Sequence, residues 1–228
     1  MKRFYKIVAV TDALGVTLDN KPVRTPARAE LRLPTRVLAD AVAAEWDAQV
    51  GDIKPEAMRL TGLANAAIDR IAPAQADFAL ALARYAESDL LCYRADEPPE
   101  LVARQEAVWD PWLNWATARY DVAFEVTSGI LHTPQTPATL ARIAEAYAAF
   151  DPLMLAALNI VVTVTGSAVL GLAFAEHQID AEALWAAGQL DEIWQAEQWG
   201  EDNLAVAARE ARQQSLAAAE RLRDLLVQ

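Results

Sequence analysis

Acidic and aromatic side chains are concentrated between Leu190 and Asp202, in the sequence LDEIWQAEQWGED, which contains no Lys or Arg. Two kinds of chemistry fit this composition. Carboxylates a few residues apart on a helix can converge as the acid and base of a hydrolase, and Asp191, Glu192 and Glu197 are candidates. Indoles beside amides and a carboxylate are instead typical of a protein-binding surface.

The spacing of these residues predicts a helix with two different faces. On a helix of 3.6 residues per turn, Glu192 shares a face with aromatic and amide side chains. The residues on that face are Trp185, Gly188, Gln189, Gln195 and Trp199. Leu190, Ile193 and Trp194 point to a second face with the spacing of a core-facing stripe. The first face is then either a binding surface or a second buried contact within the protein.

Other chemistries lack the residues that they require. The glycines occur singly, so the sequence contains no glycine-rich loop for a nucleotide. His132 and His177 have no second His or Cys at ligand spacing, and we therefore expect no metal site. Cys92 ends an apolar run, and burial would keep its thiol inert. We expect no cofactor, and a carboxylate-dependent hydrolase of unknown substrate is the competing prediction.

The charge distribution argues against several partners. The chain of 228 residues has a formal net charge of −12 and is 54% hydrophobic, which suits a globular protein with a large core. Nucleic-acid binders need a basic surface, and anionic membranes repel an acidic chain. Between Arg142 and Arg209 there are ten acidic residues and no basic one, whereas every lysine lies at or before Lys54. This asymmetry either steers a basic partner or only keeps an apolar chain soluble.

The elements that must position these residues change type near Thr35. Residues 4–33 are short apolar runs broken by turns, including a strand-turn-strand pattern around Asp19 to Pro22. From Thr35, an expected N-cap, the apolar period becomes helical, and the last helix is expected from Glu201 to Val227. The patterns predict an α+β fold, with an N-terminal α+β domain at residues 1–72 and a larger all-helical domain at 73–228.

The segment from Leu153 to Ala175 contains no charged residue and is long enough to span a bilayer. Its polar residues lie in the middle, and no aromatic belt or basic anchor flanks it. These features favour a buried core helix over a transmembrane helix.

The sequence near the N-terminus indicates no targeting segment. Arg3 leads directly into a strand-like run without the apolar region of a signal peptide, and no Arg- and Ser-rich leader is present. The single cysteine excludes an intramolecular disulfide and fits a reducing compartment. We expect a cytoplasmic protein or a mature processed form.

Six sequence blocks, in this order, resemble one family of assembly chaperones. They are RF at Arg3, LDNKPVRTP from Leu18, LPTRVLADAVAAEWDAQ from Leu33, SDLLCYRADEP from Ser88, WDPWLNW from Trp109 and LDEIWQAEQWG from Leu190. The blocks cover nearly the whole chain, so the resemblance is more specific than any single motif. The family is the assembly chaperone of the F-type ATP synthase catalytic head, the member that handles the α subunit.

The resemblance implies a non-enzymatic protein that keeps newly made ATP synthase α subunit from aggregating until the β subunit takes its place. It implies a small N-terminal β-containing domain joined to a larger helical one. The family occurs in the mitochondrial matrix and in α-proteobacteria, and this sequence resembles the bacterial, cytoplasmic type. We expect no nucleic acid, no small-molecule substrate and no stable membrane insertion.

The resemblance also places the family's critical acidic position in the block formed by Leu190, Asp191 and Glu192. We expect Glu192 to be the critical acid and keep its neighbour Asp191 as the alternative. The full partner-binding prediction comprises Glu192, Asp191, Trp185, Gln189, Trp194, Gln195 and Trp199. If residues 153–175 were exposed, that apolar segment would be an alternative client-binding surface.

Overall fold

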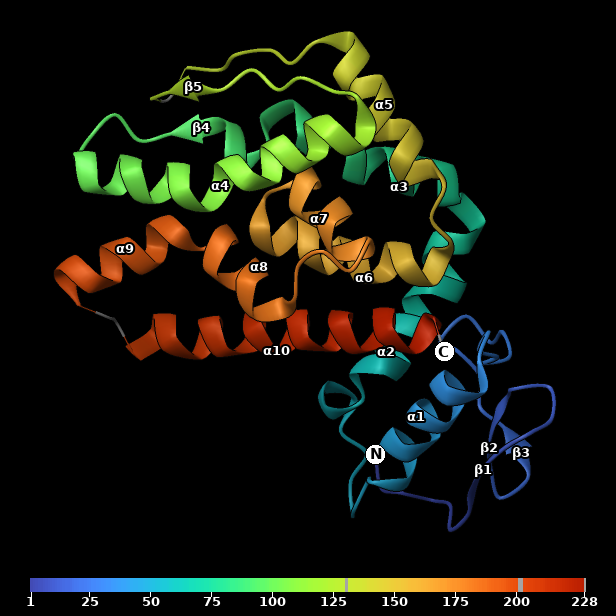
Figure 1. The fold of residues 1–228 in the computed structure, drawn as a ribbon. Coiled ribbons are helices and arrows are strands. Elements are labelled where there is room, and N and C mark those ends of the chain that lie inside the picture. The colour runs from blue at the N-terminus through green and yellow to red at the C-terminus, as the bar shows by residue number, and fades with distance from the viewer. Residues whose placement is uncertain (130, 201–202, 228) are drawn as a thin grey trace. The chain divides into compact units, whose positions relative to one another are not determined.

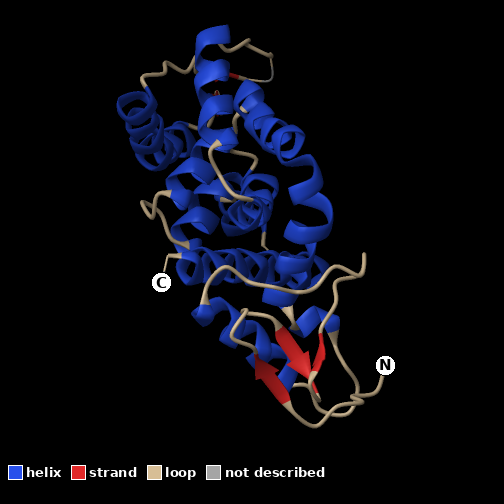
Figure 2. Ribbon diagram, turned by 90° about the vertical axis from the view of Figure 1, so that its right-hand side faces the viewer, coloured by secondary structure: helices blue, strands red, loops and turns tan. Residues whose placement is uncertain are grey.

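The computed structural model describes residues 1–129, 131–200 and 203–227. It confirms the predicted α+β class, because helices dominate and the strands of the described residues form two small sheets (Figures 1 and 2). The chain forms two compact units. Unit 1 comprises residues 1–75, 151–157 and 218–228, and unit 2 comprises residues 76–150 and 158–217. A domain boundary between residues 72 and 73 remains a prediction.

Unit 1 contains an antiparallel sheet and the helices that cover it. Strand β2 (Val16–Leu18) lies between β1 (Val8–Val10) and β3 (Lys21–Pro22), with Val8 opposite Leu18 and Thr17 opposite Pro22. Helix α1 (Arg36–Asp47) packs on the sheet, and Leu38, Ala39 and Val42 are fully buried. The elements that follow are η1 (Pro55–Ala57), α2 (Arg59–Ala66), η2 (Ala67–Ile71) and η3 (Ala72–Ala74).

Side chains at helix ends fix the local structure of unit 1. The Thr35 hydroxyl accepts a hydrogen bond from the Leu38 backbone N–H at 3.2 Å, which confirms the predicted N-cap of α1. The Glu45 carboxylate accepts bonds of 2.8 Å from the backbone N–H groups of Leu60 and Thr61, at the start of α2. This acid therefore has a structural role, since it satisfies donors that have no partner within the helix.

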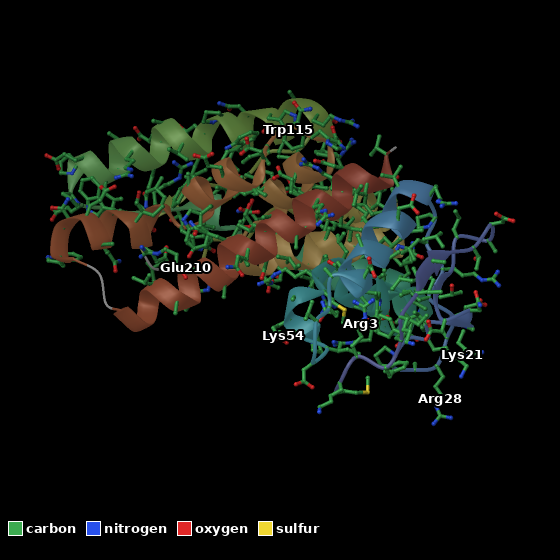
Figure 3. The ribbon with its side chains drawn as sticks, turned by 90° about the horizontal axis from the view of Figure 1, so that it is seen from below. Arg3, Lys21, Arg28, Lys54, Trp115 and Glu210 are labelled. Atoms are coloured by element: carbon green, nitrogen blue, oxygen red, sulfur yellow. The ribbon has the colours of Figure 1, made fainter. Side chains whose placement is uncertain are left out.

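Basic residues are frequent in unit 1, which holds all four lysines of the chain. Figure 3 labels Arg3, Lys21, Arg28 and Lys54, which all belong to this unit. The Arg3 guanidinium is bound within the unit, because it donates to the carbonyl oxygens of Asp47 and Gln49 at 2.6 and 2.7 Å. Lys21, Arg28 and Lys54 are exposed. Acidic residues predominate in the second half of the chain.

Unit 2 is mainly helical. Its short parallel sheet pairs β4 (Tyr93–Arg94) with β5 (Thr127–Ser128). Three described helices have residues in both units: α3 (Gln75–Ala83), α6 (Pro152–Thr165) and α10 (Asn203–Leu226). The other helical elements are η4 (Arg84–Ser88), η5 (Leu90–Cys92), α4 (Pro99–Tyr120), α5 (Pro137–Ala148), α7 (Ala168–Ala175), α8 (Ala181–Gly188) and α9 (Leu190–Trp199). The expected start of the last helix, at Glu201 and Asp202, lies outside the described residues.

The charge-free segment from Leu153 to Ala175 forms α6 and α7 and is largely buried. Every residue of α7 is buried, and Gly166, at φ +70°, separates the two helices. The Ser167 hydroxyl then caps α7 by accepting from the Leu170 N–H at 3.0 Å. Among the described helices, none combines the length and the hydrophobicity of a membrane span. The segment is therefore a core segment, as its composition predicted, and not an exposed client-binding surface.

Candidate functional site

The predicted site spans two helices, not one. The expectation of a continuous helix from Trp185 to Trp199 is wrong, because α8 ends at Gly188 and α9 begins at Leu190. Between them, Gln189 leaves the helical conformation, with φ −120° and ψ 23°. Its buried amide Nε2 donates to the Val164 carbonyl oxygen at 2.9 Å, which fixes the chain at the break.

The break separates the residues that a single helix would have aligned on one face. Gly188 is buried so closely against α6 that a Cβ there would lie 2.7 Å from Thr165 Cγ2. Trp185 is half-buried on α8, and the buried Gln189 also accepts from Arg212 at 3.4 Å. These residues therefore support α9 from within unit 2 and do not extend its exposed face.

Hydrogen bonds and an ion pair attach one side of α9 to α4. Gln105, on α4, donates from Nε2 to Asp191 Oδ1 at 2.7 Å, while its Oε1 accepts from the Ala95 N–H at 2.8 Å. Arg104 binds Glu197 with two hydrogen bonds, of 2.6 and 3.1 Å. The hydrogen bonds from Arg104 hold the pKa of the Glu197 carboxyl below its usual value.

Aromatic side chains complete this attachment. The Arg104 guanidinium carbon lies 5.9 Å from the centroid of the Trp194 ring, within the range of a cation–π contact. Trp109, fully buried on α4, donates from its indole N–H to the Ala187 carbonyl oxygen at 2.8 Å. The core-facing stripe is also visible in the burial pattern, since Leu190 is buried and both Ile193 and Trp194 are half-buried.

The other side of α9 is exposed. Glu192 has no hydrogen-bond or ion-pair partner among the residues that the structure describes. Gln195 is also exposed, and Trp199 leaves 79% of its surface accessible to solvent. The helix therefore presents a carboxylate, an amide and an indole to solvent, and its other acids, Asp191 and Glu197, bind residues of α4.

Sequence reasoning did not identify Arg104 and Gln105 as parts of this site. They lie 93 and 86 residues before their partners, Glu197 and Asp191. Their types carry no signal, because Arg and Gln are ordinary residues on a helix surface. Only the packing of α4 against α9 assigns them this role.

The structure also places the residues that were considered for thiol and metal chemistry. Burial raises the pKa of the Cys92 thiol, which keeps the sulfur protonated. His132 Nδ1 lies 2.9 Å from the Tyr93 hydroxyl. Within residues 1–129, 131–200 and 203–227, no three His, Cys, Asp or Glu side chains are grouped as metal ligands.

Comparisons with known proteins agree with the blocks that resemble an assembly chaperone. Residues 2–117 match the family described as ATP12 chaperone protein. The crystal structure of Atp12 from Paracoccus denitrificans is 40% identical in sequence, with a TM-score of 0.92, and the match covers 98% of this chain and 97% of that one. A mutant of Atp12p from the same organism matches with the same identity and coverage and a TM-score of 0.93.

A third structure extends the likeness to another bacterium. It is a protein from Agrobacterium tumefaciens that is provisionally described as a chaperone. It is 42% identical to this chain, with a TM-score of 0.92, and the match covers 99% of this chain and 86% of that one. The family match covers more than half of the present chain, and the structural matches cover nearly all of it. The chain therefore belongs to the ATP12 chaperone family.

Proposed function

We propose that this protein is an assembly chaperone of the F-type ATP synthase catalytic head. It binds unassembled α subunit, prevents its aggregation and releases it when the β subunit takes its place. It acts in the bacterial cytoplasm and performs no catalysis. Membership of a chaperone family supports the general role. The exposed carboxylate, amide and indole on α9 support this helix as the client-binding site.

The exposed side of α9 has the chemistry that such a client requires. A chaperone without an energy source must bind apolar surface firmly enough to cover it and still release it to a better partner. The Trp199 indole can cover apolar surface, while Glu192 accepts hydrogen bonds from an Arg or a backbone N–H of the client. Gln195, on the same side, can both donate and accept.

The two neighbouring acids differ in their availability. Asp191 already accepts a hydrogen bond of 2.7 Å from the buried Gln105, so part of its capacity is used within the protein. Glu192 has no such bond among the described residues, and both of its oxygens are available to a client. We therefore assign the main charge contact to Glu192. Asp191 supports the helix and contributes its second oxygen.

The same contacts argue against a hydrolase that uses these acids. Glu197 is held as a carboxylate by Arg104, with a lowered pKa, so it is a poor general acid. Asp191 is oriented by Gln105. Trp185, Gln189 and Trp194 lie against the protein itself and contribute to the client surface by holding α9 in place.

Co-purification of ATP synthase α and β subunits with tagged wild-type protein and with Glu192→Gln tests the proposal. We expect selective capture of α by the wild type. The variant should bind α at least about 30-fold more weakly, because loss of a desolvated charge contact costs about 2 to 5 kcal/mol. Glu182→Gln is the matched control, since Glu182 is also an exposed acid in the first turn of its helix.

Circular dichroism of all three proteins must coincide before binding is compared. Equal capture of α by wild type and Glu192→Gln would move the client site away from α9. Failure of the wild type to capture α, with turnover of an ester or glycoside substrate, would favour the hydrolase instead.

A further inference from the structure

Gln105 is a buried amide that joins two separate parts of unit 2. It lies on α4 and is only 1% exposed. Its Oε1 accepts from the Ala95 N–H, directly after β4, at 2.8 Å. Its Nε2 donates to Asp191 Oδ1, in the first turn of α9, at 2.7 Å. One side chain of α4 therefore ties α9 to the chain after β4 (Figure 1).

The two partners of Gln105 fix the direction of its amide. The Ala95 N–H can only donate, so it requires the amide oxygen. The Asp191 carboxylate can only accept, so it requires the amide NH2 group. An ionised carboxylate in place of the amide could not make both bonds, because one of its oxygens would face an oxygen of Asp191. The position therefore needs a donor and an acceptor on the same side chain.

Among the described residues, the other side-chain contacts between α4 and α9 are weaker. Arg104 and Glu197 leave 35% and 48% of their side chains exposed, so water and salt reduce their attraction. The Arg104 guanidinium lies 5.9 Å from the centroid of the Trp194 ring, at the outer limit of a cation–π contact. Gln105 is buried, and its bond to a charged acceptor is of the stronger kind. This bond is thus the main polar attachment of α9.

The bond acts at the end of α9 that carries Glu192. Asp191 directly precedes Glu192 in the first turn, and Leu190 is the one residue of α9 that is buried. Elements with few buried contacts open at a low free energy. The orientation of this turn therefore depends on the bond from Gln105.

We propose that Gln105 is a positioning residue for the exposed side of α9. It holds the first turn of the helix so that the Glu192 carboxylate projects in a fixed direction, and it does not touch the client itself. Asp191 serves as the acceptor that Gln105 requires. The role of Glu192 toward the client rests on the proposed function, whereas the positioning of α9 rests on the hydrogen bonds of Gln105 alone.

A pair of variants isolates this bond. Gln105→Glu leaves the Ala95 N–H an acceptor but turns a second carboxylate oxygen toward Asp191, and like charges repel. Adding Asp191→Asn reverses the bond, because the introduced amide donates to the introduced carboxylate and keeps its own oxygen free. The double variant has the same total charge as the wild-type pair, so it separates the effect of the bond from that of charge.

Hydrogen exchange of the free proteins measures positioning without the client. In Gln105→Glu, the backbone amides of α9 should exchange at least about tenfold faster than in the wild type, because a hydrogen bond to a charged group is lost. The double variant should return these rates to within about threefold of the wild type. Ala107→Glu is the matched control, since it adds the same charge at an exposed position of α4 and should exchange like the wild type.

Asp191→Ala tests the same bond from its half-exposed end and covers the case in which a buried carboxylate prevents Gln105→Glu from folding. It should speed the exchange of α9 to a similar extent. Unchanged exchange of α9 in Asp191→Ala or in folded Gln105→Glu would overturn the proposal. So would equally fast exchange in the single and double variants, or an acceleration in Gln105→Glu that is the same throughout unit 2.

Capture of the α subunit connects positioning to the proposed function. We expect Gln105→Glu to bind α at least about tenfold more weakly than Ala107→Glu does, and the double variant to bind within about threefold of that control. Faster exchange of α9 without weaker binding would refute the role of Gln105 toward the client. If exchange behaves as expected but the wild type captures no α, the proposed function is wrong and the positioning of α9 by Gln105 stands.

Discussion

Helices α7 and α9, both in unit 2, show how differently an apolar and a mixed sequence are used. Helix α7 has no charged residue, and all eight of its residues are buried. Helix α9 has three acids and two tryptophans, and among its ten residues Leu190 is the one that is buried. The more apolar segment is thus part of the core, and the mixed one faces solvent. Hydrophobicity alone would have selected a buried segment as the client surface.

The two helices are also held by different interactions. Helix α7 relies on close packing, with Gly171 against the Tyr147 hydroxyl and Val162. Helix α9 is held by hydrogen bonds and an ion pair from α4. Substitutions in α7 should therefore affect folding, and substitutions on the exposed side of α9 should affect binding.

The largest effect is expected for Gly171→Ala. The added Cβ would collide with the Tyr147 hydroxyl and lie 2.8 Å from Val162 Cγ2, where both side chains come from other helices. Overpacking of this kind costs about 3 kcal/mol of the free energy of unfolding, measurable by urea denaturation. Gly62→Ala is the control, since nothing lies within 4 Å of a Cβ there, and it should gain up to about 1 kcal/mol. Equal stabilities would refute close packing as the basis of α7.

The second prediction concerns Asp89, which is fully buried at the N-terminus of α7 and accepts from the Val169 N–H at 3.0 Å and the Leu91 N–H at 3.1 Å. Burial raises the pKa of this carboxyl to about 6. Because the folded pKa lies above the unfolded one, the folded state binds more proton between about pH 4 and 6, and stability falls as the pH rises through that window.

Asp89→Asn removes this titration. The variant is destabilised, because the two oxygens of Asp89 accept from the Leu91 and Val169 N–H groups, whereas an asparagine amide has only one oxygen. The stability advantage of the wild type over the variant should shrink by about 2 kcal/mol between pH 4 and pH 7. Urea denaturation across this range measures the difference. A constant difference would mean that Asp89 does not titrate there.

A smaller effect, on binding and not on stability, is expected for Trp199→Ala. The side chain is 79% exposed, so its removal leaves the core intact. If the indole covers apolar client surface, capture of the α subunit should weaken by about 1 to 2 kcal/mol, which is roughly 5- to 30-fold. Val126→Ala, at a half-exposed apolar side chain far along the chain from α9, should bind like the wild type. An unfolding midpoint that falls with Trp199→Ala would show that the indole belongs to the core.

The smallest effect is expected for Glu197→Gln. Arg104 and Glu197 are both substantially exposed, so solvent and salt weaken their attraction. The variant should show a slight loss of stability at low salt that disappears in high salt, as thermal unfolding at the two ionic strengths will show. A large loss that persists in salt would mean that α9 depends on this ion pair.

The sequence predicted the features that depend on local chemistry. The Thr35 cap, the change from strand to helix at that residue, and the burial of the charge-free segment follow from residue types and spacing. The two faces of α9 also follow from its period, since Leu190 is buried and Glu192 is exposed.

The features that it could not predict depend on contacts between distant residues. The break at Gln189 arises because its amide binds the Val164 carbonyl oxygen, 25 residues earlier. The attachment of α9 depends on Arg104 and Gln105, which lie 93 and 86 residues before their partners. Nothing in the local sequence indicates these partners, because each is an ordinary surface residue until the helices pack.

The bond from Gln105 to Asp191 spans 86 residues, and this has a consequence for biosynthesis. A nascent chain that has reached Phe150 contains α4 with its binding groups but none of α9. The proposed client surface can form only after α9 has also been synthesised and has left the exit tunnel. Under the proposed function, translation products that stop before α9 should therefore not bind the client.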